Sequence, residues 1–193
     1  MARHKYEFRP DKTGSGLLSK LYLTQKQRLS LLKWGLYGLT LLVLSVLQDV
    51  ILCRVGIFGA TTDLLPCVIF LICVYQGAEN GGVFAVVASA LYQFSGTAPG
   101  YYIIAVITLL GVFAAIFRQG YLRKSMGADL LCAGIIFALY ELIVFFVAVA
   151  AGNSSVSRIP TVAITFGLTT VVTPALYALI ATIDKIGGNS WKE

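Results

Sequence analysis

Charged residues are scarce in this chain: Asp, Glu, Lys and Arg make up 12% of its 193 residues, whereas a soluble domain has about 25%. Hydrophobic residues make up 58%. A chain with so few charges cannot cover its surface with polar side chains, which excludes an ordinary soluble domain. The composition therefore predicts an all-α, polytopic membrane protein.

Metal-binding and catalytic signatures are also missing. The only histidine, His4, lies in the polar N-terminal segment, and the four cysteines show no C-x-x-C spacing. Cysteine in an apolar run acts as a small hydrophobic residue, so we expect no metal site and no cofactor. The sequence has no nucleophile elbow, phosphate-binding loop or zinc-protease motif, and we therefore assign no catalytic residue and expect no enzyme.

Six apolar runs form the body of the chain, a single membrane domain over residues 31–183, between a tail at 1–30 and a tail at 184–193. The runs cover residues 31–53, 64–75, 81–94, 101–117, 130–151 and 161–183. A helix needs about 20 residues to cross the hydrocarbon core. The second and third runs are shorter, so they either span with their polar flanks or form a re-entrant hairpin. We favour spanning, because the flanks lengthen the second run to about 17 residues.

The distribution of positive charge predicts the orientation. Six spans place both termini on one side, and 13 of the 15 Lys and Arg residues would lie on that side, leaving only Arg54 and Arg158 opposite. By the positive-inside rule, both termini are expected in the cytoplasm, with the chain in the plasma membrane. The basic N-terminal tail, part of it a possible amphipathic helix, is expected to contact anionic lipid and not nucleic acid.

Small residues form a stripe on the third run. Gly81, Ala85 and Ser89 recur every four residues, and Gln93 continues the same face. Small residues at this spacing let two membrane helices approach closely. We interpret the stripe first as a packing face, on which Gln93 either bonds across the contact or lines a ligand site.

Asp63 stands at the start of the second run and has two interpretations. It follows Thr61 and Thr62, and all three residue types cap helix N-termini, where an acid also meets the positive end of the helix dipole. Alternatively, Asp63 makes a functional contact near the outer surface. Gln48 and Asp49, late in the first run, are the residues expected to meet it there.

Glu141 interrupts the fifth run and is the most costly residue in the chain. An acid near the middle of a membrane helix costs about 2.5–3.5 kcal/mol on insertion scales. It should therefore face the protein interior, either protonated or bonded to a hydroxyl such as that of Tyr140 in a neighbouring chain or that of Thr170. A functional site and a buried bond that joins helices remain equally good interpretations.

The stretch from Ser45 to about Arg118 resembles MreD, the small integral membrane subunit of the bacterial rod-shape (elongation) system. That family ends its first span in Leu-Gln and opens its second with Pro-Asp-Leu-Leu, and glycines follow the second span and open the third. The matching residues are Leu47, Gln48, Asp63, Leu64, Leu65, Gly77, Gly81, Gly82, Phe84, Gly96 and Gly100. Thr62 replaces the proline, and Gln93 stands where the family has an acid.

The resemblance implies a non-enzymatic scaffold. MreD-like proteins partner the membrane-anchored MreC and the actin-like MreB, and they help hold the peptidoglycan elongation machinery, including RodA and its transpeptidase. The small-residue face of the third run would then belong to a groove that docks a partner helix. The family also resembles, in overall fold, the substrate-binding components of energy-coupling-factor vitamin transporters. A small-molecule binding subunit is therefore the alternative function, and it would need an outward-open polar and aromatic pocket.

Overall fold

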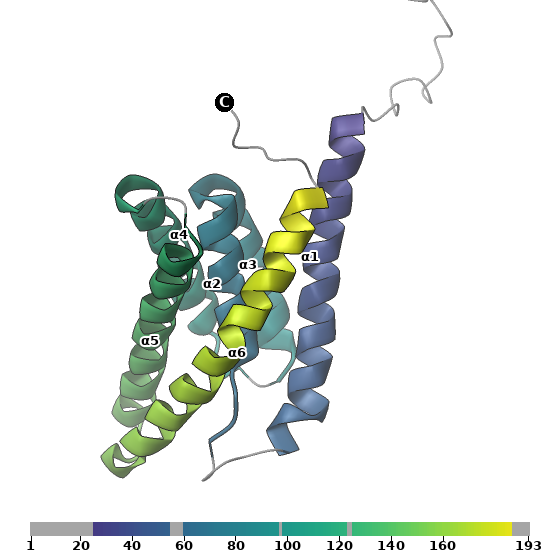
Figure 1. Cartoon of the computed structure of the whole chain (residues 1–193). Coiled ribbons are helices and arrows are strands. Elements are labelled where there is room, and N and C mark those ends of the chain that lie inside the picture. The colour runs from purple at the N-terminus through teal and green to yellow at the C-terminus, as the bar shows by residue number, and fades with distance from the viewer. Residues whose placement is uncertain (1–24, 55–59, 97, 123–124, 187–193) are drawn as a thin grey trace, which may run out of the picture.

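The computed structural model describes residues 25–54, 60–96, 98–122 and 125–186. These residues form six α-helices and two short 3-10 helices, with no strand in the described part of the chain (Figure 1). The elements are α1 (Gln25–Val50), η2 (Leu52–Arg54), α2 (Leu64–Gln76), α3 (Ala78–Phe94), α4 (Ile103–Tyr121), α5 (Met126–Ala150), η3 (Val156–Arg158) and α6 (Ile159–Ile186).

The predicted all-α class and the six predicted helices agree with this architecture, and the helix ends differ. α1 begins six residues before the predicted first run, so the described part of the basic lead-in is continuous with α1. α4 and α6 each continue past their predicted ends. Arg118 and Asp184, which lie just beyond those predicted ends, have ion-pair partners inside the protein. The rest of the N-terminal tail and the last seven residues lie outside the described residues.

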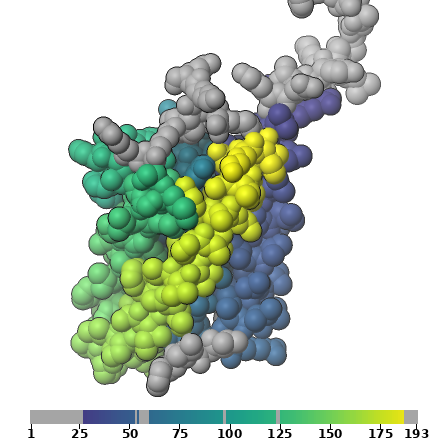
Figure 2. Space-filling model, in the orientation of Figure 1, coloured from purple at the N-terminus to yellow at the C-terminus, as the bar shows by residue number. Residues whose placement is uncertain are grey.

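Helix α2 is the centre of the fold. It contacts each of the other five α-helices, and Tyr75 is its only residue that is not buried. The apolar run at residues 64–75 is therefore apolar on every side of its helix, as expected for a helix surrounded by protein. Figure 2 shows α6 lying obliquely across one face of the bundle, from the side of α5 to the side of α1.

The outer surface of the bundle is apolar. Helices α1, α4, α5 and α6 are long and apolar enough to cross a membrane, judged by length and composition. They turn large aliphatic side chains outward: Leu39, Leu109, Leu131 and Val171 are each more than half exposed. Exposure of such a large apolar surface to water would be unfavourable, whereas lipid tails are as apolar as these side chains.

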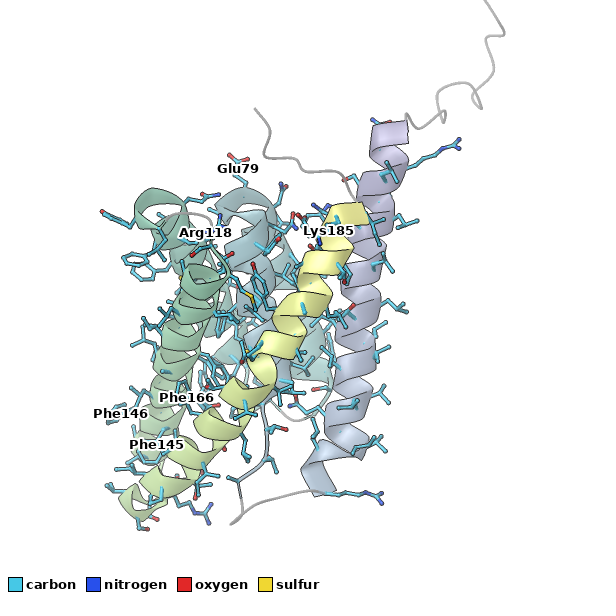
Figure 3. The ribbon with its side chains drawn as sticks, in the orientation of Figure 1. Glu79, Arg118, Phe145, Phe146, Phe166 and Lys185 are labelled. Carbon is cyan, nitrogen blue, oxygen red and sulfur yellow. The ribbon has the colours of Figure 1, made fainter. Side chains whose placement is uncertain are left out.

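The bundle has two ends, which the helices define. At the termini end α1 begins and α6 ends, and Glu79, Arg118 and Lys185 mark this end in Figure 3. The α2–α3 turn, the end of α4 and the start of α5 lie at the same end (Figure 1). The far end is the opposite one, where α1, α3 and α5 end. The α2–α3 hairpin therefore extends between the far end and the termini end of the bundle.

A single residue, Gly77, joins α2 to α3. Its φ of 88° lies in the left-handed region that favours glycine, and its N–H donates to the Cys73 carbonyl. Four residues on, a Cβ on Gly81 would lie 2.8 Å from Cys73 Cα. Cys73 also faces Gly111 of α4, where a Cβ would lie 3.0 Å from its sulfur. Glycines therefore let α3 and α4 pack closely against α2.

Gly81→Ala is expected to destabilise the protein by about 1–3 kcal/mol, because the added methyl group overpacks the α2–α3 contact. Gly134→Ala in α5 is the matched control: a Cβ there meets nothing within 4 Å, so stability should be unchanged or slightly raised. Equilibrium unfolding in mixed detergent micelles, followed by tryptophan fluorescence, measures both. Equal effects of the two variants would contradict this account of the hairpin.

Candidate functional site

Gln48 of α1 holds the start of α2. Its side-chain oxygen accepts hydrogen bonds from the backbone N–H of Leu64 (3.0 Å) and of Leu65 (3.2 Å). Its Nε2 donates to Asp63 Oδ1 at 3.0 Å. Gln48 is 4% exposed. The first turn of a helix leaves backbone donors without partners, and here a glutamine from another helix satisfies two of them.

The expectation that the Asp63 side chain caps α2 is therefore wrong. Asp63 occupies the N-cap position but makes no side-chain cap bond. The capping oxygen belongs to Gln48, which leaves the Asp63 carboxylate available for other helices. The alternative expectation, that Gln48 and Asp63 meet, agrees with the structure.

The Asp63 carboxylate links helices that are distant in sequence. Its Oδ2 accepts from the hydroxyl of Tyr92 in α3 at 3.0 Å and, more weakly, from that of Tyr140 in α5 at 3.5 Å. Its backbone N–H donates to Thr169 of α6 at 3.2 Å. Both tyrosines and Thr169 are buried. With Gln48, this far-end network (Gln48, Asp63, Tyr92, Tyr140 and Thr169) joins four helices to the start of α2.

Three other predicted polar candidates do not join this network. Asp49, Gln93 and Glu141 each have a buried side-chain oxygen without a hydrogen-bond partner in the described part of the chain. Gln93 therefore makes no bond across the helix contact through that oxygen. The predicted partner for Glu141 is wrong as well: the Thr170 hydroxyl donates to the Phe166 carbonyl in its own helix.

The small-residue stripe of α3 faces the interior. Gly81 is buried, and Ala85 and Ser89 are each 0% exposed. The Ser89 hydroxyl donates to the Val86 carbonyl. These burials agree with the packing interpretation. They contradict the expectation that this face lies open to a partner helix, because the protein's own α2 and α4 occupy it.

A second polar network lies at the termini end. Lys33 Nζ of α1 forms an ion pair with Asp184 Oδ1 of α6 at 3.0 Å, and it donates to Gln76 Oε1 of α2 at 2.9 Å. The Gln76 amide in turn donates to Asp184 Oδ1 and to the Tyr37 hydroxyl. All four side chains are buried. This termini-end network (Lys33, Tyr37, Gln76 and Asp184) joins the first, second and last helices.

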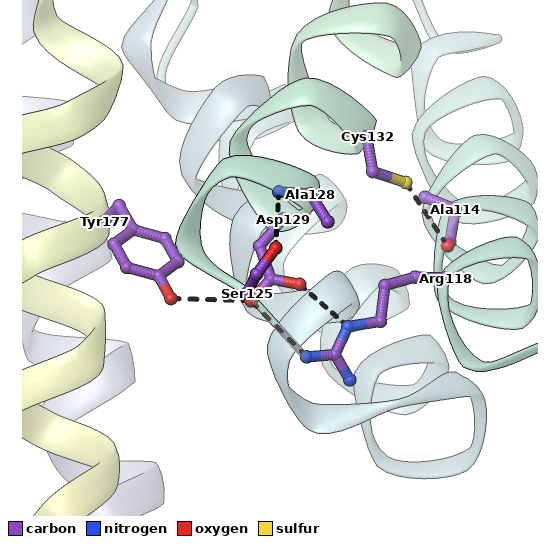
Figure 4. Close-up of polar contacts among 7 residues, drawn as sticks. All are labelled: Ala114, Arg118, Ser125, Ala128, Asp129, Cys132 and Tyr177. Atoms are coloured by element: carbon purple, nitrogen blue, oxygen red, sulfur yellow. Dashed lines mark hydrogen bonds and ion pairs between the residues drawn. The ribbon is translucent and has the colours of Figure 1, made fainter. Parts of the chain in front are cut away.

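Arg118 and Asp129 form a second buried ion pair at this end (Figure 4). Arg118 Nε lies 2.8 Å from Asp129 Oδ1, and Nη2 lies 3.3 Å from Oδ2, which also accepts from the Tyr177 hydroxyl of α6 at 3.4 Å. The sequence predicts a basic loop after the fourth run, with Arg118 in it, and this is wrong: Arg118 belongs to α4 and is 6% exposed.

Several of these residues carried only a weak signal in the sequence. The tyrosines look like ordinary apolar residues of a helix. Lys33, Arg118 and Asp184 stand near the ends of apolar runs, where charged residues commonly flank a span. The one available signal was that an acid and a base occur near run ends on the same side, which is compatible with ion pairing between neighbouring helices.

Comparisons with protein families, with curated proteins and with solved structures find no match to this chain.

Gln48→Leu is expected to destabilise the protein by about 2–4 kcal/mol, because two backbone donors of α2 and the Asp63 carboxylate lose their partner. Gln93→Leu is the matched control. The Gln93 side-chain oxygen has no partner in the described residues, so this change should cost less than about 1 kcal/mol. Unfolding midpoints in mild detergent compare the two, and a cost for Gln93→Leu as large as that for Gln48→Leu would refute the assignment of the cap.

Lys33→Met is expected to cost about 3–5 kcal/mol, since it leaves the Asp184 carboxylate buried without its charge partner. The double variant Lys33→Met/Asp184→Asn should lose less than the sum of its single variants. Lys185 follows Asp184 in the chain and is exposed, so Lys185→Met serves as the control and should change stability little. Additive costs in this cycle would show that the two side chains do not interact.

Proposed function

We propose that this chain is a non-enzymatic scaffold subunit of the bacterial elongation (rod-shape) complex, an MreD-like protein that supports cell shape and lateral peptidoglycan synthesis. The observation that carries the proposal is the junction between Gln48 and residues Asp63 to Leu65. The family resemblance rests on these residues, and in the structure they form one hydrogen-bonded contact. The members of this sequence signature meet in space as one structural unit, which supports the proposal.

The arrangement of the helices supports a six-span topology. The α2–α3 hairpin extends between the two ends of the bundle (Figure 1), which favours crossing over a re-entrant loop. Six crossings keep both termini on one side, and the positive-inside rule assigns that side to the cytoplasm. The protein is then a multi-pass protein of the bacterial plasma membrane, with its termini end inside and its far end outside.

The polar side chains support a scaffold better than a small-molecule binder. Those of the far-end network bond to each other, so they do not form an open polar pocket. Two grooves between α1 and α3, of about 420 and 220 Å³, are lined mostly by aliphatic and aromatic side chains. A vitamin-binding subunit needs convergent polar groups in its pocket, whereas apolar grooves on a membrane bundle suit other membrane helices.

The proposed partners are an MreC-like membrane-anchored protein, an MreB-like cytoskeletal protein, and RodA with its transpeptidase. Contacts with the membrane proteins are made between helices in the lipid. The basic tail at residues 1–30 meets the anionic inner leaflet. No catalytic step is assigned to any residue of this chain.

Purification of the tagged full chain from native membranes in mild detergent should enrich these partners. Mass spectrometry identifies them, and an unrelated multi-span protein with the same tag provides the control. Because the contacts are proposed to be between helices, they should survive high salt but weaken in harsher detergent. Recovery of a transmembrane coupling subunit with two ATPases, in place of elongation proteins, would replace this proposal with the transporter alternative.

A further inference from the structure

The acidic side chains in the interior of the bundle are of two kinds. Asp129 and Asp184, at the termini end, are each paired with a base, at 2.8 and 3.0 Å. Asp63 and Glu141, the acid pair of the half nearer the far end, form no ion pair in the described part of the chain. A charge inside a membrane bundle is costly unless it is paired. The acid pair therefore lacks what the other two acids have.

No base of the described chain compensates the acid pair. Arg54 and Arg158, the two bases beyond the far ends of the helices, are both exposed to the surroundings, and neither forms an ion pair with a described acid. Residues 55–59 and residue 97, which lie outside the described part of the chain, include no Lys, Arg or His. Any positive charge beside the acid pair therefore has to come from outside the chain.

The two members of the acid pair act on each other. Tyr140, whose hydroxyl donates to Asp63 Oδ2, directly precedes Glu141 in α5. The charges of the Asp63 and Glu141 carboxylates repel each other, and the charge of Glu141 also reaches Tyr92, which donates to the same Asp63 oxygen. Two interacting carboxylates in a medium of low dielectric constant do not both ionise, and they titrate as one unit.

The elements packed around the acid pair contribute few other titratable groups at this level. Those that face it are Cys67 of α2, Tyr92 of α3 and Tyr140 of α5. Helix α1 contributes the Gln48 amide, and α6 contributes the Thr169 hydroxyl. The charged residue of α4, Arg118, lies at the termini end in its pair with Asp129 (Figure 3). The charge of the acid pair is therefore set mainly by its own two members.

We propose that Asp63 and Glu141 hold one proton between them, and that the acid pair is thus a proton-binding site inside the bundle. An unpartnered oxygen does not by itself indicate such a site; the second carboxylate and the missing base do. The inference goes beyond the proposed scaffold function and does not depend on it.

The hydrogen bonds assign the proton to one member of the pair. Asp63 stays ionised, because Gln48, Tyr92 and Tyr140 all donate to its carboxylate, and donors favour the charged form. Glu141 holds the proton. It is 9% exposed, and its Oε1 is buried without a partner in the described residues, so nothing there stabilises a negative charge.

A metal ion fits the acid pair less well than a proton. Metal ions that prefer oxygen, such as Ca²⁺, take six to eight ligands. The Asp63 oxygens already accept three hydrogen bonds, and the described residues bring together no group of three or more His, Cys, Asp or Glu side chains. A proton needs a single oxygen, which Glu141 supplies.

The proton controls the contact between α5 and the start of α2. With the proton bound, the Tyr140 hydroxyl bonds to Asp63 and joins the two helices. When Glu141 releases the proton to water, two negative charges face each other at this contact, and α5 should separate from α2. Asp63 is partly exposed and lies before the first residue of α2, so the acid pair exchanges protons with the far end.

Infrared spectroscopy of the full chain in lipid bilayers tests the proposal without any substitution. A protonated carboxyl group has a C=O stretching band above the amide I band, and the wild-type chain should show one at neutral pH. Labelling the side-chain carboxyl carbon of glutamate with ¹³C should shift this band, whereas the same label in aspartate should not. The absence of the band, or a shift only with labelled aspartate, would overturn the proposal.

Substitutions test whether the two acids share the proton. Glu141→Gln should abolish the band, and Glu79→Gln, at an exposed position at the start of α3, is the control that should keep it. Asp63→Asn should lower the pH at which the band is lost by about one unit or more, because the repelling charge is gone. A band that ignores Asp63→Asn, or that disappears when Na⁺ replaces K⁺ at constant pH, contradicts a proton held by the pair.

Hydrogen exchange in lipid nanodiscs, measured by mass spectrometry, tests the helix contact. Above the pH at which the band is lost, the far half of α5 and the start of α2 should exchange faster than below it, after correction for the intrinsic rate. This difference should vanish in Glu141→Gln and persist in Glu79→Gln. Equal exchange on both sides of that pH in the wild-type chain would show that the proton does not control the contact.

Discussion

The structure depends on one constraint, which is that a short helix is buried at its centre. Thirteen residues of α2 lie among the other five α-helices. Because both ends of α2 are buried in protein, neighbouring helices must provide their hydrogen-bond partners. Gln48 supplies the partner at its first turn. At its last residue, Gln76 is bonded to Lys33 and Asp184.

These two end contacts determine how the remaining helices are arranged. Both draw on α1 and α6, the helices farthest apart in the sequence: Lys33 and Asp184 are separated by 151 positions. Thr169 and Tyr177 give α6 two further bonds, to the start of α2 and to α5. Polar bonds inside a membrane bundle fix the register between helices where apolar packing alone permits sliding. Polar contacts thus fix the interior of the bundle, and its exterior is apolar.

The sequence predicts the helices well and their polar contacts poorly, for different physical reasons. Apolar runs indicate where each helix lies, and residues 64–75 match α2 almost residue for residue, whereas the ends of helices with charged termini, such as α4 and α6, are predicted less well. A charged residue at the end of a run is either solvated or buried in an ion pair, and Arg118 is buried in a pair with Asp129. The choice depends on which helices are neighbours. The sequence predicts that Gln48 and Asp63 meet, because both are expected near the outer surface. It does not predict that Gln48, and not Asp63, caps the start of α2.

Asp63 and Glu141 are two acids in the same bundle that differ in their hydrogen bonding. Asp63 receives bonds from Gln48, Tyr92 and Tyr140, so its cost is offset within the chain and its role is to hold helices together. Glu141 has the same kind of side chain at similar expense, yet its Oε1 remains without a partner in the described residues. Asp49 and Gln93 also have a buried side-chain oxygen without a partner in the described residues, so such an oxygen does not by itself indicate a site. The Asp63 carboxylate, which bonds to side chains of three other helices, therefore determines more of the helix packing than the Glu141 carboxyl does.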